Sequence, residues 1–213
     1  MLGMKEYPDK YFELAIVDPP YGIGASKGTW GSSNVGKVTN YGKKSWDHQT
    51  PDSEYFIELI RVSKNQIVWG ANHFGNFPPA PCWIVWDKVK TGEFADCELA
   101  WTSFDSTVRK FAFMWNGMMQ GSNANGSEFV GDLSKKEIRI HPTQKPVQLY
   151  KWLLKNYAKE GDKILDTHLG SGSSRIAAFD GGFEFVGYEL DKDYFEAAEK
   201  RFAQHKSQLK LFV

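Results

Sequence analysis

The chain has 213 residues, enough for one sizeable domain and too few for two comfortable ones. Hydrophobic residues make up 41% and charged residues 24%, an ordinary globular balance, and no apolar run approaches the ~20 residues of a membrane span. Lys plus Arg and Asp plus Glu balance at 26 each, which argues against tight non-specific binding to nucleic acid but allows a local basic face. The two cysteines, Cys82 and Cys97, lack Cys-x-x-Cys spacing. We therefore expect no disulfide framework, no structural zinc site and a reducing cytoplasm.

Short apolar runs between turn residues predict strands. In chain order these are Leu14–Val17, Gln66–Trp69, Trp83–Trp86, Glu98–Trp101, Arg109–Trp115, Lys163–Leu165 and Glu184–Tyr188. Helical spacing of apolar residues predicts four helices, Asp52–Val62, Pro146–Tyr157, Ser173–Phe179 and Asp191–His205. The stripes expected to face the core are Phe56, Leu59 and Ile60 in the first, Val147, Tyr150, Leu154 and Tyr157 in the second, and Tyr194, Ala198 and Phe202 in the last.

The order of these elements predicts an α/β fold in one domain, residues 1–213. Strands and helices alternate in the second half, which indicates a parallel sheet. The first half has consecutive strands, so part of the sheet is expected to be antiparallel. Two stretches rich in Gly, Ser and Asn, Gly22–Lys44 and Asn116–Lys136, are expected to be mobile loops.

The tetrapeptide Asp18-Pro19-Pro20-Tyr21 directly follows an apolar strand, Leu14–Val17. It is therefore placed at a carboxyl end of the sheet, where open α/β folds bind ligands. The two prolines fix the backbone and leave rigid carbonyls beside a carboxylate and an aromatic ring. Acceptors next to a flat surface suit a planar ring that bears an NH2 group. The alternative is a proline-rich turn capped by Asp.

A second pattern, Lys163–Gly172, runs from a strand through Asp166 into a Gly-x-Gly turn and a helix start. Glycines in such a turn let the backbone approach a nucleotide-like ligand, and the helix N-terminus favours electron-rich groups. The next strand ends in Glu189, which can accept hydrogen bonds from ribose hydroxyls. The alternative role for Glu189 is a charge at a helix start.

A third segment, His141-Pro-Thr-Gln-Lys-Pro146, gathers donor side chains before a predicted helix. Donors at a helix N-terminus can seat a carboxylate, although a simple N-cap would look the same.

The three motifs and their order resemble the DNA amino-methyltransferases that modify adenine-N6 or cytosine-N4, and more narrowly their permuted "beta" group. In that group the Asp-Pro-Pro-Tyr motif comes first, His-Pro-Thr-Gln-Lys-Pro later and the glycine motif last, as here, and the resemblance covers nearly the whole chain. It implies a doubly wound mixed sheet of the Rossmann-like, S-adenosylmethionine-dependent methyltransferase fold. It also implies DNA as the partner, with the target base flipped out of the stack.

By this resemblance, Asp18 and the Pro19 carbonyl would hold the target amine, Pro20 would stiffen the turn, and Tyr21 would stack on the base. Attack on the sulfonium methyl would be direct, and positioning would supply most of the catalysis. The residues expected to contact S-adenosylmethionine are Asp166, Gly170, Ser171, Gly172, Glu189, His141, Thr143 and Lys145. No metal is expected.

The sequence departs from the family pattern in three ways. Thr167-His168 replaces the usual Pro-Phe pair, and we expect His168 to be a local packing variant. The stretch before His141 that would recognise the target sequence is short, so specificity is expected to involve Gly22–Lys44 or a second subunit of a homodimer. One strand that usually precedes Leu14–Val17 is expected to be missing at the N-terminus, which would weaken cofactor binding.

Three alternatives stay open. Cytosine-N4 enzymes more often have Ser at the first motif position, so Asp18 favours adenine. Enzymes that methylate RNA or protein glutamine tend to have Asn there and to have the glycine motif upstream. An inactive DNA-binding or scaffold module is an alternative of another class.

The last residues, Gln208-Leu209-Lys210-Leu211-Phe212-Val213, resemble the peptide Gln-Leu-Ser/Asp-Leu-Phe by which bacterial proteins bind the replication sliding clamp. Leu211 and Phe212 would fill a hydrophobic pocket, while Gln208 would hydrogen-bond at its rim. Clamp attachment would raise the local DNA concentration for a chain without net charge. The alternative is that Leu209, Leu211 and Phe212 pack on the domain itself.

We predict that a peptide spanning Lys206–Val213 binds a bacterial sliding clamp in a fluorescence titration. The same peptide with Leu211→Ala and Phe212→Ala should lose this binding, because the pocket anchors are removed. Equal titration curves for the two peptides would contradict the clamp hypothesis.

Overall fold

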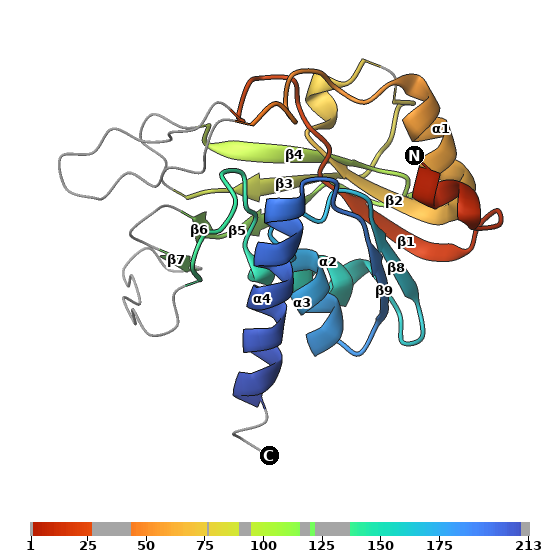
Figure 1. Cartoon of the computed structure of the whole chain (residues 1–213). Coiled ribbons are helices and arrows are strands. Elements are labelled where there is room, and N and C mark those ends of the chain that lie inside the picture. Colours follow the sequence, from red (N-terminus) through yellow and green to blue (C-terminus); the bar gives the residue numbers. More distant parts are fainter. Residues whose placement is uncertain are drawn as a thin grey trace.

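The computed structural model describes residues 2–26, 44–75, 77–89, 95–115, 120–121 and 137–209. Figure 1 shows the elements in chain order: η1 (Leu2–Glu6), β1 (Phe12–Val17), α1 (Ser53–Val62), β2 (Ser63–Trp69), η2 (Ala71–His73), β3 (Trp83–Asp87), β4 (Cys97–Thr102), β5 (Arg109–Ala112), β6 (Met114–Trp115), β7 (Gln120–Gly121), α2 (Val147–Tyr157), β8 (Lys163–Asp166), α3 (Ser173–Asp180), β9 (Glu184–Gly187) and α4 (Lys192–Leu209). Every predicted strand and helix is present among these elements. Within the described ranges, no helix is long and apolar enough to cross a membrane.

The central sheet has seven strands in the order β5-β3-β4-β2-β1-β8-β9. Strands β2, β1, β8 and β9 form a continuous parallel block. Strand β4 runs antiparallel to both β2 and β3, and β3 pairs in parallel with β5. The doubly wound mixed sheet expected from the sequence is thus confirmed, including its partly antiparallel first half.

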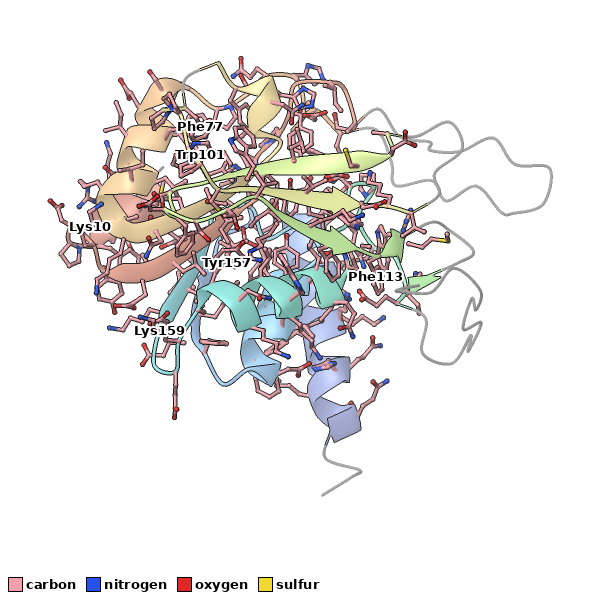
Figure 2. The ribbon with its side chains drawn as sticks, turned by 180° about the vertical axis from the view of Figure 1, so that it is seen from behind. Lys10, Phe77, Trp101, Phe113, Tyr157 and Lys159 are labelled. Carbon is pink, nitrogen blue, oxygen red and sulfur yellow. The ribbon has the colours of Figure 1, made fainter. Side chains whose placement is uncertain are left out.

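Helices cover both faces of this sheet, with α1 on one side and α2, α3 and α4 on the other (Figure 1). Because side chains alternate along a strand, β1 supplies Leu14 and Ile16 to the core under α2 and α3 and supplies Ala15 and Val17 to the core under α1. Figure 2 shows part of the α1 side, where Phe77 stacks on Trp101 with ring centroids 4.7 Å apart. Both cores stiffen the strands whose ends form the site.

The carboxyl ends of the parallel strands meet at one edge of the sheet. Asp18 follows β1, Asp166 ends β8, and Glu189 follows β9. Since β4 runs the other way, its first residues arrive at the same edge: Glu98 pairs with Trp86 near the end of β3. The edge therefore collects side chains from both directions of the chain.

The predicted strand Arg109–Trp115 is divided at Phe113 into β5 and β6. The Phe113 carbonyl accepts a 3.0 Å hydrogen bond from the indole of Trp86, and its N–H donates to the Asp87 carbonyl at the end of β3. Beyond this point β3 offers no further partner, so the chain leaves the large sheet and pairs instead as β6 with β7.

The predicted core face of α1 was partly wrong. The buried residues are Tyr55, Leu59 and Val62, whereas Ile60 is 39% exposed and Phe56 is only partly buried. In this orientation Tyr55, Leu59 and Val62 pack into the core, and the hydroxyl of Tyr55 lies 2.6 Å from that of Thr167 beyond β8. Asp52 caps the N-terminus of α1, where its side chain accepts the Tyr55 N–H at 2.8 Å.

At the chain's end, α4 continues to Leu209 instead of stopping at His205, so Gln208 and Leu209 of the proposed clamp segment are helical. Tyr194, Ala198 and Phe202 are buried as predicted. Leu211 and Phe212 lie outside the described residues, as do residues 27–43 and most of 116–136, which were expected to be mobile loops.

Gly70 ends β2 in a left-handed conformation, with φ +70°, against the ring of Tyr21. A Cβ atom at this position would lie 2.0 Å from Cε1 of that ring, a distance that real Cβ contacts do not reach. Gly182 has almost the same conformation, φ +72°, but no described atom lies within 4 Å of its Cβ position.

We predict that Gly70→Ala lowers the free energy of unfolding more than Gly182→Ala does. Both substitutions force Ala into the left-handed region, which costs about 1 kcal/mol, but only the first also collides with Tyr21. Urea unfolding of the two variants measures the difference. Equal losses of unfolding free energy would show that the packing of the Tyr21 ring does not require glycine at position 70.

Candidate active site

The Asp18–Tyr21 segment turns sharply at the end of β1. Tyr21 donates its hydroxyl to Oδ1 of Asp18 at 2.7 Å, and the ammonium of Lys145 lies 2.6 Å from the same oxygen. Within the described part of the chain, both contacts of this carboxylate fall on Oδ1. Oδ2 is therefore left with acceptor capacity for a further donor, beside the carbonyl of the buried Pro19.

Glu98 lies beside Asp18, Tyr21 and Lys145 and forms a charged cluster with them. The sequence motifs did not reveal it. Its Oε2 lies 3.1 Å from the Lys145 ammonium, and its Oε1 lies 2.6 Å from the ammonium of Lys88. Four charges thus alternate in a row, from Lys88 through Glu98 and Lys145 to Asp18. Glu98 has no motif of its own, because it is only the polar first residue of the predicted strand Glu98–Trp101.

Burial and mutual attraction set the protonation of this row. Burial disfavours the Glu98 carboxylate, but Lys145 and Lys88 overcome it and lower the pKa of Glu98 to about 2. Burial likewise opposes the Lys145 ammonium, yet Asp18 and Glu98 raise the pKa of Lys145 above its usual value. For Asp18 burial prevails, and its pKa is raised in spite of Lys145. Asp18 is therefore the group in the row whose carboxylate takes up a proton most readily.

The ring of Tyr21 has a flat neighbour. The imidazole of His73 stacks on it with centroids 5.0 Å apart and planes 12° from parallel, and Phe74 meets its edge at 6.1 Å. Burial, together with Asp18, raises the pKa of Tyr21 far above its usual value, so the hydroxyl stays protonated and remains a donor. His73 follows the apolar strand β2 without a recognisable motif, and the sequence did not single it out.

The glycine turn after β8 forms the second part of the site. Asp166, 1% exposed, accepts the hydroxyl of Ser174 at 2.5 Å and the N–H of His168 at 3.0 Å, which fixes the turn from beneath. Burial raises the pKa of Asp166 to about 7. Gly170 and Gly172 both adopt positive φ, at +51° and +73°, as the sequence pattern predicted for a turn into a helix.

Glu189 closes this turn from the neighbouring strand. Its Oε2 accepts the N–H of Gly170 at 2.7 Å, and its Oε1 accepts the N–H of Asp191 at 2.8 Å. These two bonds orient the carboxylate, and each oxygen can still accept another hydrogen bond. The buried Ser171 faces Ser173, with hydroxyl oxygens 3.1 Å apart, at the start of α3.

The segment from His141 to Lys145 links the two parts. The ring of His141 lies 3.9 Å from the Cβ position of Gly170, and its Nδ1 accepts the Thr143 N–H at 3.3 Å. Burial, with a contribution from Lys145, lowers the pKa of His141 to about 4, so the ring is neutral at neutral pH. His141 thus lies toward the glycine turn, whereas Lys145 contacts Asp18, Glu98 and Tyr21.

Trp46, which no motif indicated, packs against the other side of His141. The two ring centroids are 5.0 Å apart, and Tyr194 of α4 meets His141 edge-on at 4.2 Å. Lys44 reaches α4 as well, with its ammonium 2.9 Å from Asp191. A cavity of about 500 Å³ opens here next to Glu189, lined by Lys44, Ser45, Trp46, Leu190 and Asp191.

His168 lies below the glycine turn. Its Nδ1 is 3.0 Å from the Thr167 hydroxyl, and its ring meets Tyr55 edge-on at 5.4 Å. Burial lowers the pKa of His168 to about 4. These contacts agree with the expected packing role. A smaller cavity, of about 260 Å³, lies at the opposite ends of β8 and β9, away from the motif residues.

Metal ligands do not gather at this site: among the residues that the structure describes, no three His, Cys, Asp or Glu side chains could together hold a metal ion.

Comparison with known proteins gives concordant results. Among curated proteins, the type II methyltransferase M2.DpnII of Streptococcus pneumoniae is 27% identical, over 89% of this chain and 81% of that protein. The M1.HpyAVI–SAM complex has the same fold, with a TM-score of 0.52 at 17% identity over 94% of this chain and 92% of that one. So does PvuII DNA methyltransferase, described as cytosine-N4-specific, with a TM-score of 0.55 at 11% identity over 93% and 82%.

A family model described as DNA methylase, of the N6/N4 type, matches residues 85–200, more than half of the chain. The matched segment contains Glu98, the His141–Lys145 segment, the glycine turn and Glu189, and it begins after Asp18. The motif order and the fold agree with this match, and the chain belongs to the N6/N4 family of DNA methylases.

Proposed function

We propose that this protein transfers a methyl group from S-adenosylmethionine to the exocyclic N6 amino group of adenine in DNA. The observation that supports this most directly is the geometry of Asp18. Lys145 and Tyr21 hold one oxygen of its carboxylate, so the other oxygen and the Pro19 carbonyl can accept the two hydrogens of an amine. A purine ring held there would lie beside Tyr21, whose ring already stacks on a flat partner, His73.

The glycine turn fits the cofactor. Gly170 places no side chain over the turn, and Glu189 presents two oriented oxygens that can receive ribose hydroxyls. A wide, open depression lined by Lys44, Trp46 and Asp191 lies beside this turn. In this proposal Asp166, Ser171 and Gly172 shape the turn, while His141 and Thr143 face the methionine end. We assign Lys145 to the base-binding part of the site instead, because its ammonium contacts the Asp18 carboxylate.

S-adenosylmethionine, when bound, supplies an electrophilic methyl group on sulfur, which takes the electron pair of the broken C–S bond. Asp18 and Pro19 draw the amine hydrogens to one side and aim the nitrogen lone pair at this carbon. Positive charge grows on the nitrogen as the new N–C bond forms, and the Asp18 carboxylate stabilises it. The nitrogen then releases one proton, which Asp18 Oδ2 can accept because burial raises the pKa of this group.

One feature favours adenine over cytosine. The first motif residue is Asp18, where cytosine-N4 enzymes more often have Ser. The likeness to the cytosine-N4-specific PvuII enzyme is one of fold, at 11% identity. Burying a charged cluster such as that around Lys145 carries a large desolvation penalty. An inactive scaffold would have no need of such a cluster.

We predict that the chain, given methyl-labelled cofactor and unmethylated DNA, produces N6-methyladenine, detected by mass spectrometry after digestion to nucleosides. Asp18→Asn should lower kcat by at least about 100-fold, because an amide replaces the charged acceptor in the transition state. The affinity for S-adenosylmethionine, measured by calorimetry, should change little.

Asp180→Asn is the matched control. Asp180 is also paired with a lysine at 2.6 Å, and its side chain is 17% exposed against 15% for Asp18, but it lies at the end of α3 and contacts Lys151. It should retain wild-type turnover. N4-methylcytosine as the product would replace the adenine assignment, and no methylated base at all would remove the proposed activity.

A further inference from the structure

A carboxylate that none of the family motifs contains, Glu98, reaches the proposed amine site from β4. It touches neither the glycine turn nor Oδ2 of Asp18. Its two oxygens instead contact two ammonium groups, Lys145 at 3.1 Å and Lys88 at 2.6 Å, and Oε2 also lies 3.5 Å from the Tyr21 hydroxyl. The side chains of Lys145 and Glu98 are 3% and 22% exposed, so solvent screens their charges only weakly.

The Lys145 ammonium creates an electrostatic problem for the proposed reaction. It orients Asp18 through Oδ1, but it also places a positive charge beside a nitrogen that becomes positive as it is methylated. Like charges at this range in a buried site oppose each other strongly. Lys88 adds a second positive charge to the cluster. An anion close to both ammonium groups would remove this penalty while leaving Lys145 in place, and Glu98 is that anion.

We propose that Glu98 is a positioning residue of the methyl-transfer site, which holds Lys145 against Asp18 and offsets the positive charge of Lys145 and Lys88 near the target amine. The proposal rests on the proposed function of this site. Lys145 is further fixed by the buried indole ring of Trp69, 5.5 Å away, and by the Tyr21 hydroxyl, 3.1 Å away. In this proposal Glu98 acts through Lys145 and the Tyr21 hydroxyl, not on the base itself.

Every titratable group that faces Asp18 enters the expected pH dependence. Tyr21 lies on its own segment, Lys145 precedes α2 and Glu98 comes from β4. Tyr55 of α1, Tyr150 of α2 and Asp166 of β8 also interact electrostatically with Asp18. Both tyrosines have pKa values raised by burial and stay neutral, so Lys145 and Glu98 are the nearest fixed charges. Removing one or the other should move the titration of Asp18 in opposite directions.

The experiment compares Glu98→Gln and Lys145→Met with the wild type across pH. Glu98→Gln should lower kcat about 10-fold, equivalent to ~1.4 kcal/mol of barrier, and should move the acid limb of the kcat profile to lower pH. The sign follows because Gln keeps an oxygen that can accept from the Lys145 ammonium, while loss of the negative charge favours the ionised form of Asp18. Lys145→Met should move the acid limb to higher pH. Glu98→Asp, which keeps the charge, should recover most of the lost turnover.

Glu58→Gln is the matched control, because Glu58 and Asp9 share Arg61 on the surface as Glu98 and Asp18 share Lys145 in the site. It should leave kcat and its pH profile unchanged. A Glu98→Gln enzyme with normal kcat, or acid limbs that move the same way in both site variants, would overturn the proposal.

A second measurement does not depend on turnover. The carboxyl carbon of Asp18 can be titrated by 13C NMR in selectively labelled protein, assigned with Asp18→Asn. The midpoint should fall in Glu98→Gln and rise in Lys145→Met. If the wild type methylates no DNA but these shifts occur, the proposed function fails while the electrostatic coupling stands. Unchanged midpoints in an active enzyme would refute the role of Glu98 alone.

Discussion

The buried ammonium group of Lys145 is the constraint on which this site depends. An unpaired charge in a protein interior costs several kcal/mol, so the fold must bring anions to it. Two arrive, Asp18 from the end of β1 and Glu98 from the start of β4. They can converge only because one strand runs with the parallel block and the other runs against it. The reversed direction of β4 is therefore a requirement of the site as well as a feature of the sheet.

The short segment from His141 to Lys145 then sets the distance between the two halves of the proposed reaction. Its first residue lies against the glycine turn and its last one on Asp18. Reacting atoms must come within ~3–3.5 Å for efficient transfer, so a displacement of either half would lower the reaction rate. Anchoring both halves to one segment, immediately before the rigid helix α2, reduces the ways in which they can drift apart.

Local signals in the sequence predicted most of the fold. Apolar runs located the strands, and the glycine turn and Asp18–Tyr21 were placed at strand ends, where the structure has them. The direction of β4 depends on pairing with strands distant in sequence, so the arrival of Glu98 at the site could not be read from Glu98–Trp101 alone. For the same reason the motif around Lys145 predicts its position in the chain but not its partners, Asp18 and Glu98.

The face of α1 shows a second limit. Apolar spacing allowed two neighbouring stripes, one through Ile60 and one through Tyr55, which differ by a small rotation of the helix. The structure has the second, in which the Tyr55 hydroxyl contacts Thr167, more than a hundred positions away. Likewise, the break between β5 and β6 depends on the indole of Trp86 reaching the Phe113 carbonyl. Such polar contacts leave no periodic trace in a sequence.

The deep placement of Lys145 has a consequence for how ionic strength acts on this protein. Contacts between basic side chains and DNA phosphates weaken steeply as salt rises, because counterions compete for the phosphates. Charges as enclosed as Lys145, with 3% of its side chain exposed, are largely beyond the reach of mobile ions. Added salt would therefore separate two kinds of electrostatics: it would weaken contacts with DNA phosphates, while the charge balance between Lys145 and Asp18 would persist.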